Sequence, residues 1–199
     1  MAREMSNKLV ILDINGLLCC KELHIDKSPN KRSMKKTTDC IDLRKMRIYI
    51  RPGAVDFINN LMKNYRVGFW SSTTEWNAKQ IIQALDLNAK KFAFTWYRDR
   101  TKLDPDYLKN TKVKKHDTVK NMQDIFDCPT INESRRYGWR NTVLIDDSKS
   151  KTRFNPVINL INVSEYELKD VGRDETYDLE FFELLQDRIE RKFDIMREL

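Results

Sequence analysis

Acidic, amide and hydroxyl side chains directly follow three of the apolar segments in this sequence. They are Asp13 and Asn15, then Ser71 and Ser72, and finally Asp146 and Asp147. A polar residue at the end of one strand is ordinary. In an open parallel sheet, however, ligands bind beyond the carboxyl ends of the strands, near the point where the strand order reverses. If these three strands are neighbours, the side chains therefore form one ligand-binding site rich in oxygen atoms.

Five apolar segments are typical of buried strands. They cover residues 8–14, 66–70, 92–97, 141–145 and 159–163. Apolar residues at helical spacing predict helices that begin near Arg51, after Thr74 and at Val119, and a last helix over residues 177–196. Strands that alternate with helices indicate parallel βαβ units. The expected fold class is therefore α/β, with a doubly wound, mainly parallel sheet in a single domain over residues 1–199.

The composition narrows the class of protein. At 199 residues, with 40% hydrophobic and 34% charged residues, the chain can bury a sizeable core. No apolar run reaches the ~18 residues that a membrane helix needs, and residues 1–8 are too short and polar for a secretory signal. The four cysteines form no CxxC pair, and only two histidines accompany them, which favours reduced thiols over a zinc site. We therefore expect a nuclear or cytoplasmic protein with no membrane partner.

The excess of positive charge favours anionic partners. Lys and Arg number 37 against 30 Asp and Glu, so the formal net charge is +7. Many of these cations lie in residues 21–50, which we interpret as a basic insertion after the first strand. Such a segment could bind nucleic acid through phosphate contacts, but a solvated loop is the commoner case and no aromatic-interleaved pattern accompanies it. Charge alone leaves phosphoprotein, nucleic acid and nucleotide open as partners.

Four short motifs, in order along the chain, resemble those of the haloacid dehalogenase superfamily. They are Asp13-Ile-Asn-Gly-Leu17, Phe69-Trp-Ser-Ser-Thr73, Lys120 within Thr118–Met122, and Leu144-Ile-Asp-Asp-Ser148. The segments Ile50-Arg-Pro-Gly-Ala-Val-Asp-Phe57 and Asp146-Asp-Ser-Lys-Ser-Lys151, the latter followed by Phe154-Asn-Pro156, are similar to the branch of RNA polymerase II C-terminal-domain phosphatases and NLI-interacting-factor-like phosphatases. The resemblance covers about residues 9–163 and implies a haloacid-dehalogenase-like α/β fold.

This resemblance implies a Mg2+-dependent phosphatase that acts on phosphoserine or phosphothreonine in proteins. Asp13 would be the nucleophile and would form an aspartyl-phosphate. A carboxylate and a phosphate dianion repel each other, so a cation must bridge them. Mg2+, which prefers oxygen ligands, would be held by Asp13, Asp146, Asp147 and the backbone carbonyl of Asn15.

The resemblance also implies groups that bind the phosphate. Ser71, with Ser72 beside it, would donate a hydrogen bond to a phosphoryl oxygen, although a helix cap is an equally good reason for a serine there. Lys120 would neutralise the charge of the transferring group. Lys114 and Lys115 are alternatives for this lysine, and an ordinary surface role remains open for all three.

One position departs from the family pattern. The family's second Asp, which protonates the leaving group and then activates water, is Asn15 here. An amide cannot exchange a proton in this way, and losing a general acid and base typically costs about 10²–10⁴ in rate. The substitution is compatible with an attenuated natural enzyme, an engineered variant, or a module that binds phosphorylated proteins without turnover. Leu17, where the family usually has Thr, favours natural divergence. A phosphatase for nucleic acid or nucleotide phosphate is a further alternative.

Overall fold

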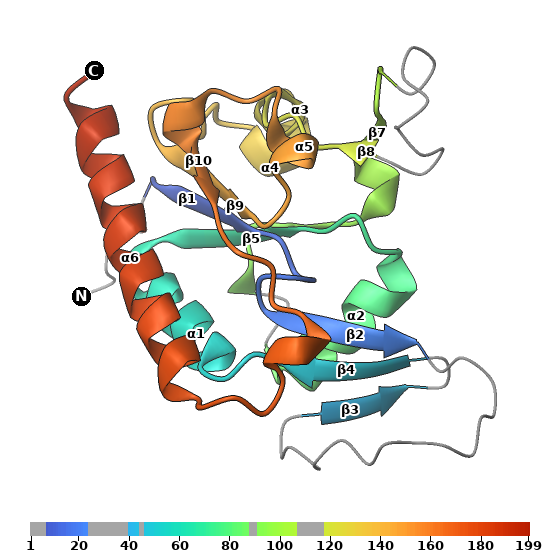
Figure 1. Ribbon diagram of the computed structural model, residues 1–199. Helices are drawn as coiled ribbons and strands as arrows, with labels where there is room; N and C mark the ends of the chain where they lie inside the picture. Colours follow the sequence, from blue (N-terminus) through green and yellow to red (C-terminus); the bar gives the residue numbers. More distant parts are fainter. Residues whose placement is uncertain (1–6, 24–39, 44–45, 88–90, 107–117) are drawn as a thin grey trace.

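The centre of the molecule is a parallel five-stranded sheet (Figure 1). A computed structural model describes residues 7–23, 40–43, 46–87, 91–106 and 118–199. The strands lie in the order β10 (Leu160–Asn162), β9 (Thr142–Asp146), β1 (Leu9–Leu12), β5 (Arg66–Trp70) and β6 (Thr95–Trp96), and all neighbours are parallel. The chain builds β5 and β6 on one side of β1 and then returns to build β9 and β10 on the other. The strand order therefore reverses beside β1, where such sheets bind their ligands.

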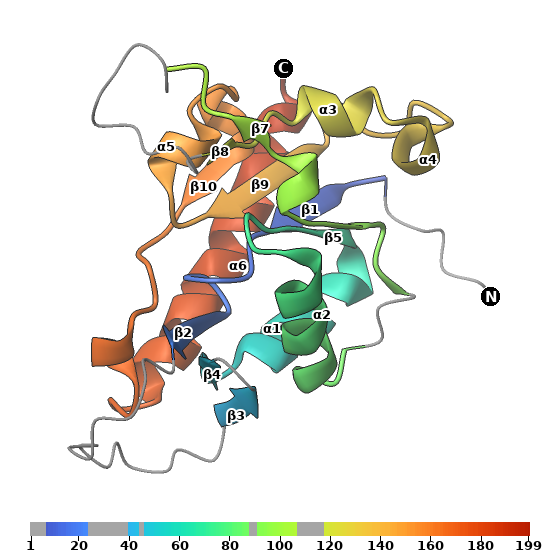
Figure 2. The same cartoon turned by 90° about the vertical axis from the view of Figure 1, so that its right-hand side faces the viewer.

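Helices cover both faces of this sheet (Figures 1 and 2). One face carries α1 (Ala54–Asn64), α2 (Glu75–Ala84) and α6 (Thr176–Arg197), and the other carries α3 (Gln123–Phe126) and α4 (Pro129–Asn132). Val10 and Leu12 of β1 belong to the first apolar core, whereas Leu9 and Ile11 belong to the second. This alternation follows from the two-residue period of a strand. The predicted doubly wound α/β architecture is confirmed.

An antiparallel sheet is inserted between β1 and α1. It has the order β2 (Cys19–Leu23), β4 (Met46–Ile50), β3 (Cys40–Leu43). The insertion expected over residues 21–50 is therefore present, but its described ends form strands rather than a solvated loop, and Tyr49 of β4 is buried beside Cys20 of β2. Residues 24–39 and 44–45, which carry most of the cations behind the nucleic-acid alternative, lie outside the described residues.

A buried ion pair ties this insertion to the last helix. The Arg51 guanidinium, at the junction of β4 and α1, donates to Asp178 of α6 over 2.7 Å, and both side chains are almost fully buried. The same guanidinium stacks on the Phe181 ring, 3.4 Å from its centroid. Arg173 also pairs with Asp178. Because removing one partner would leave an uncompensated buried charge, the Arg51-Pro-Gly segment is a structural anchor for α6.

The remaining elements are short. They are η2 (Arg98–Arg100), β7 (Lys102–Leu103), β8 (Thr118–Val119), α5 (Lys149–Thr152), η3 (Val157–Asn159) and η4 (Leu168–Asp170), where η denotes a 3-10 helix. Three predicted boundaries were wrong. The strand expected over residues 92–97 is confined to β6, the helix expected from Arg51 begins at Ala54, and the helix expected from Val119 begins at Gln123. The last helix, expected over 177–196, is confirmed as α6.

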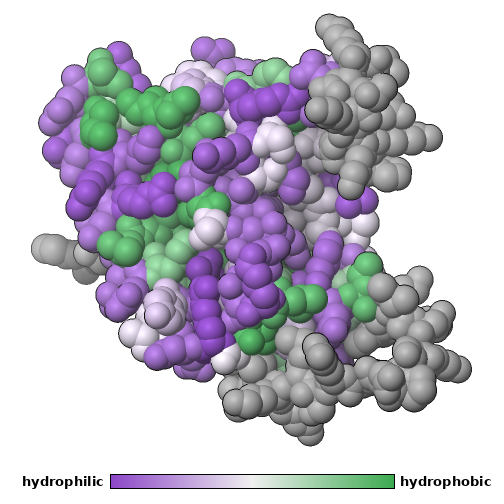
Figure 3. Space-filling view, viewed as in Figure 1, coloured by the Kyte–Doolittle hydropathy of each residue, from purple (hydrophilic) through white to green (hydrophobic). Residues whose placement is uncertain are grey.

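The surface is largely hydrophilic on the face shown in Figure 3, with apolar residues gathered over α6. Leu184 and Ile195 are examples of exposed apolar side chains on that helix. Among the helices of the described ranges, none combines the length and the apolar character needed to span a membrane. All four cysteines lie within those ranges and are unpaired.

Candidate active site

Parallel pairing brings the expected acidic residues to one edge of the sheet. Leu12 of β1 lies opposite Ile145 of β9, so Asp13 follows β1 at the level where Asp146 ends β9. The Asp13 N–H donates to the Ile145 carbonyl over 3.0 Å and continues the ladder to this point. Residues more than a hundred positions apart therefore meet because β1 and β9 are neighbours.

Three carboxylates form a cluster at this edge. One oxygen each from Asp13, Asp146 and Asp147 lies within 4.8 Å of the other two. Burial raises the pKa of Asp13, and the charge of Asp146 adds to this effect. Burial, together with the charges of Asp13 and Asp146, raises the pKa of Asp147 to about 7. Carboxylates held this close resist ionisation unless a cation joins them.

Lys120 supplies one such cation from inside the protein. Its Nζ donates to Asp13 Oδ1 over 2.9 Å and to Asp146 Oδ2 over 2.6 Å, and its side chain is 0% exposed. Burial disfavours the charged ammonium, but the two carboxylates outweigh burial and hold the pKa of Lys120 above its ordinary value. Of the three candidate lysines, Lys120 is the one that the structure brings to the acidic cluster, since Lys114 and Lys115 lie outside the described residues.

Lys120 lies in a loop rather than on the predicted helix. The buried side chain of Asn155 explains the difference, because it satisfies the backbone of this loop as a helix otherwise would. Its Nδ2 donates to the Lys120 carbonyl over 2.7 Å, and its Oδ1 accepts from the Met122 N–H over 2.7 Å. Asn155 was not among the predicted site residues. The sequence signal for Asn155 was its place in the segment Phe154-Asn-Pro156.

The turn after Asp13 brings Asn15 and Gly16 to the cluster. Asn15 is half-buried, and its Oδ1 is buried without a hydrogen-bond partner among the described residues. Gly16 has a φ of +88°, and a Cβ at this position would lie 2.8 Å from both Cγ and Oδ2 of Asp147. The glycine therefore makes room for the Asp147 carboxylate. Our sequence reading missed Gly16, although a Gly two residues after a strand signals such a turn.

A family comparison agrees with this geometry. The model of the NLI interacting factor-like phosphatase family matches residues 8–195, which is nearly the whole chain. This chain belongs to that family. The resemblance to the haloacid dehalogenase superfamily, and to its C-terminal-domain phosphatase branch, is thereby confirmed. The family match extends the 9–163 span of the motifs through most of α6.

Individual proteins give the same result. The chain is 28% identical over 171 residues to an uncharacterized FCP1 homology domain-containing protein of Schizosaccharomyces pombe, a match that covers 82% of this chain and 63% of the relative. The chain thus spans less than two thirds of that curated relative.

Two solved structures have the same fold at low identity. Fcp1, described as an essential RNA polymerase II CTD phosphatase, has a TM-score of 0.53 at 18% identity, over 89% of this chain and 49% of its own. A fission yeast Fcp1 variant bound to beryllium fluoride has a TM-score of 0.56 at 17% identity, over 89% and 51%. These likenesses show the fold, and the chain spans about half the length of each.

Two serines of this family member follow β5, on the other side of β1. Ser71 is buried, and its Oγ accepts a hydrogen bond from the Thr73 N–H over 3.2 Å. It does not cap α2, which begins at Glu75 without a side-chain cap. The Ser72 Oγ is buried and has no partner within the described ranges. Both hydroxyls lie beyond the carboxyl end of β5, as predicted.

The acidic cluster fits a divalent cation. Oδ1 of Asp147 is buried without a hydrogen-bond partner in the described part of the chain, as is Oδ1 of Asn15. Buried oxygen atoms without donors are costly, and a cation would satisfy them. The donor set consists of oxygen atoms, which is the preference of Mg2+. Three carboxylates against one internal ammonium also leave negative charge for a cation to neutralise.

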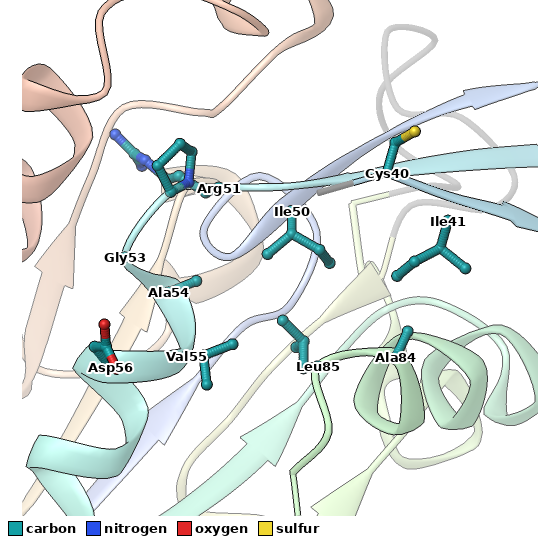
Figure 4. Close-up of a pocket in the computed structure, with 11 residues that line it drawn as sticks. Cys40, Ile41, Ile50, Arg51, Gly53, Ala54, Val55, Asp56, Ala84 and Leu85 are labelled. Carbon is teal, nitrogen blue, oxygen red and sulfur yellow. The ribbon is translucent and has the colours of Figure 1, made fainter. Parts of the chain in front are cut away.

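A separate pocket of about 360 Å³ lies between the insertion sheet and the helices α1 and α2 (Figure 4). Ile41, Ile50 and Leu85 approach one another across it, whereas the Arg51 guanidinium points away from them. Its lining shares no residue with the acidic cluster. The chemistry therefore belongs to the carboxyl edge of the parallel sheet rather than to this pocket.

Replacing Gly16 with Ala should weaken metal binding in addition to destabilising the fold. The positive φ costs a residue with a Cβ about 1–2 kcal/mol, and the new methyl group would displace the Asp147 carboxylate. We expect the Mg2+ concentration for half-maximal stabilisation in thermal unfolding to rise at least about tenfold, which corresponds to 1.4 kcal/mol of binding free energy. Gly138→Ala is the control, because a Cβ there meets nothing within 4 Å. An unchanged Mg2+ response would contradict this role of Gly16.

Proposed function

We propose that this protein is a Mg2+-dependent phosphatase that hydrolyses phosphoserine or phosphothreonine in proteins through an aspartyl-phosphate on Asp13. The observation that carries the proposal is the cluster of Asp13, Asp146 and Asp147 around the buried ammonium of Lys120. Family membership supports a phosphatase of this type.

Asp13 attacks the phosphorus atom of the substrate. Its Oδ1 is held by Lys120, so its Oδ2 forms the new P–O bond while the bond from phosphorus to the leaving oxygen breaks. Water then attacks the aspartyl-phosphate, which releases inorganic phosphate and restores the carboxylate. A fixed ammonium on Oδ1 orients the carboxylate before each attack and limits its reorganisation.

The remaining polar groups bind the phosphoryl group and the metal. The Ser71 and Ser72 hydroxyls donate to phosphoryl oxygens. Asp13, Asp146, Asp147 and the Asn15 carbonyl would hold Mg2+. The metal would supply positive charge that offsets the repulsion between the carboxylates and a phosphate dianion.

Asn15 attenuates both chemical steps. An amide cannot protonate the leaving alkoxide, and it cannot take a proton from the attacking water. An acidic leaving group, such as a phenolate, departs without help, so aryl phosphates should react faster than serine phosphates. The same residue favours a second candidate function, namely a domain that uses this site to bind phosphorylated proteins without turnover.

The substrate class rests on similarity. Both solved neighbours are described as RNA polymerase II CTD phosphatases, which act on a phosphorylated protein. The formal net charge of +7 is also favourable for an anionic partner. These observations support a phosphoprotein substrate.

The test is hydrolysis of para-nitrophenyl phosphate and of a phosphoserine peptide, each with Mg2+ and with EDTA. We expect release of para-nitrophenolate that requires Mg2+, and slower release of phosphate from the peptide. Excess Mg2+ should restore the activity that EDTA removes. Complete inactivity combined with retained phosphopeptide affinity would select the binding domain, and loss of both would reject a phosphate site.

A further inference from the structure

The buried lysine of the site has little capacity left for a substrate. An ammonium has three N–H donors, and Lys120 directs two of them at Asp13 and Asp146. Its side chain is 0% exposed, so Lys120 has no contact with solvent. A phosphate dianion that approaches from solvent therefore needs a second cation closer to the entrance.

Lys151 is in the right place to provide it. It lies on α5, which starts directly after Asp146, Asp147 and Ser148, and its carbonyl accepts the Lys120 N–H over 2.8 Å. The two lysines are thus on adjacent stretches of backbone, one buried and one half-buried. Thr152, fully buried, donates to the Ser148 carbonyl over 3.3 Å and fixes the orientation of this short helix.

Lys151 lies near the acidic cluster but forms no ion pair with it in the described structure. Its backbone meets that of Lys120 beside the cluster, and its charge opposes the rise in pKa of both Asp13 and Asp147. Yet within the described ranges the structure shows Lys151 in neither an ion pair nor a side-chain hydrogen bond, whereas Lys120 and Arg153 are both paired. Lys151 is therefore a half-buried cation near the acidic cluster whose donors have no partner in the described part of the chain.

We propose that Lys151 binds the phosphate of the substrate and acts as the outer cation of this site. The inference rests on the proposed function and names a residue to which the sequence motifs assign no role. Its ammonium donates to a phosphoryl oxygen on the solvent side of Asp13, while Lys120 stays with the carboxylates. A charge-assisted hydrogen bond of this kind is stronger than a neutral one.

Lys149 offers a matched control on the same helix. It is two residues earlier, carries the same charge, and is exposed. Successive helical residues are separated by about 100°, so positions two apart point in nearly opposite directions. A general effect of net charge would be the same for both lysines, whereas a phosphate ligand is specific to Lys151.

The first experiment measures inorganic phosphate binding by calorimetry at saturating Mg2+, which needs no turnover. Lys151→Ala should weaken phosphate affinity at least about tenfold, Lys151→Arg should recover most of it, and Lys149→Ala should change it less than twofold. Equal effects of the two alanine variants, or a change in Mg2+ affinity alone, would overturn the proposal. If Lys151→Ala unfolds, Lys151→Gln preserves the aliphatic stem and is measured instead.

The second experiment separates this inference from the proposed function. With para-nitrophenyl phosphate, Lys151→Ala should raise KM about tenfold and change kcat less, because the lost contact is made already in the bound substrate. A wild-type protein that binds phosphate through Lys151 but hydrolyses nothing would refute the phosphatase and retain Lys151 as a ligand. Hydrolysis with unchanged KM in the variant would do the reverse.

Discussion

Asp13→Asn should abolish hydrolysis while leaving the protein folded. The amide has nearly the shape of the carboxylate but cannot form the aspartyl-phosphate. Loss of a nucleophile typically lowers kcat by about 10⁴–10⁶-fold. The measurement is the initial rate with para-nitrophenyl phosphate at saturating Mg2+, together with acid quenching to detect phosphate bound covalently to the protein.

The fold should tolerate this change. Burial raises the pKa of Asp13, so its ionised form costs free energy in the folded state at neutral pH, and a neutral amide removes that cost. Lys120 keeps its 2.6 Å contact with Asp146. We therefore expect a melting temperature at least equal to that of the wild type without metal. Asp187→Asn, on the exposed side of α6, is the matched control and should keep full activity. Residual hydrolysis above one per cent of the wild-type rate would exclude Asp13 as the nucleophile.

Asn15→Asp should raise the rate, which is the opposite of most active-site substitutions. The carboxyl group would provide the missing general acid for the leaving oxygen and the missing base for water, each worth about 10²–10⁴ in rate. The gain should be larger for a phosphoserine peptide than for para-nitrophenyl phosphate, because only the alkoxide needs a proton in order to leave. Steady-state rates with both substrates measure this difference.

Presteady-state kinetics give a sharper test of Asn15. With para-nitrophenyl phosphate, whose leaving group needs no acid, hydrolysis of the aspartyl-phosphate without a base should limit turnover of the wild type, so para-nitrophenolate should appear in a burst that approaches one equivalent per site. The burst should shrink in Asn15→Asp as the second step accelerates. Asn59→Asp, which adds the same charge on the exposed side of α1, should change neither quantity. No gain in rate would contradict our account of position 15 and favour the binding domain.

The fourth carboxylate should also change metal dependence. Asp147 is already hard to ionise because of burial and the charges of Asp13 and Asp146, and an aspartate at position 15 would add to that repulsion. We expect Asn15→Asp to be less stable than the wild type without metal and to gain more stability on addition of Mg2+. Thermal unfolding with and without Mg2+ measures both effects.

Local patterns of apolar residues were sufficient to predict the central strands from the sequence. Leu9–Leu12 is apolar throughout, which is typical of a strand buried on both faces, and all four residues are 0% exposed. The helical spacing of apolar residues along α6 was equally clear, and the predicted ends of this helix differ from the observed ends by one residue each. The short helices were less predictable. Side chains such as Asn155, which are distant in sequence, decide where they begin.

Some residues of the candidate site could be predicted from the sequence, and others were found only in the structure. Asp13, Asp146 and Asp147 could be named because each follows a strand, and Asn15 because it stands where the family has an acid. The role of Gly16 depends on the Asp147 side chain, which is more than a hundred residues away. The choice of Lys120 depends on a loop held by Asn155, and its full burial between two carboxylates has no signal in the residues around it.

The sequence by itself determined most of the elements and the polar residues at the strand ends, because these follow from residue type and from periodicity over a few neighbours, and the resemblance to the family added the expected acid at position 15. Only the tertiary structure decided that β1 lies between β5 and β9, that Lys120 contacts two carboxylates, and that the Lys151 backbone lies beside that of Lys120. Strand order and charge pairing depend on contacts between distant segments. Local sequence does not encode those distances.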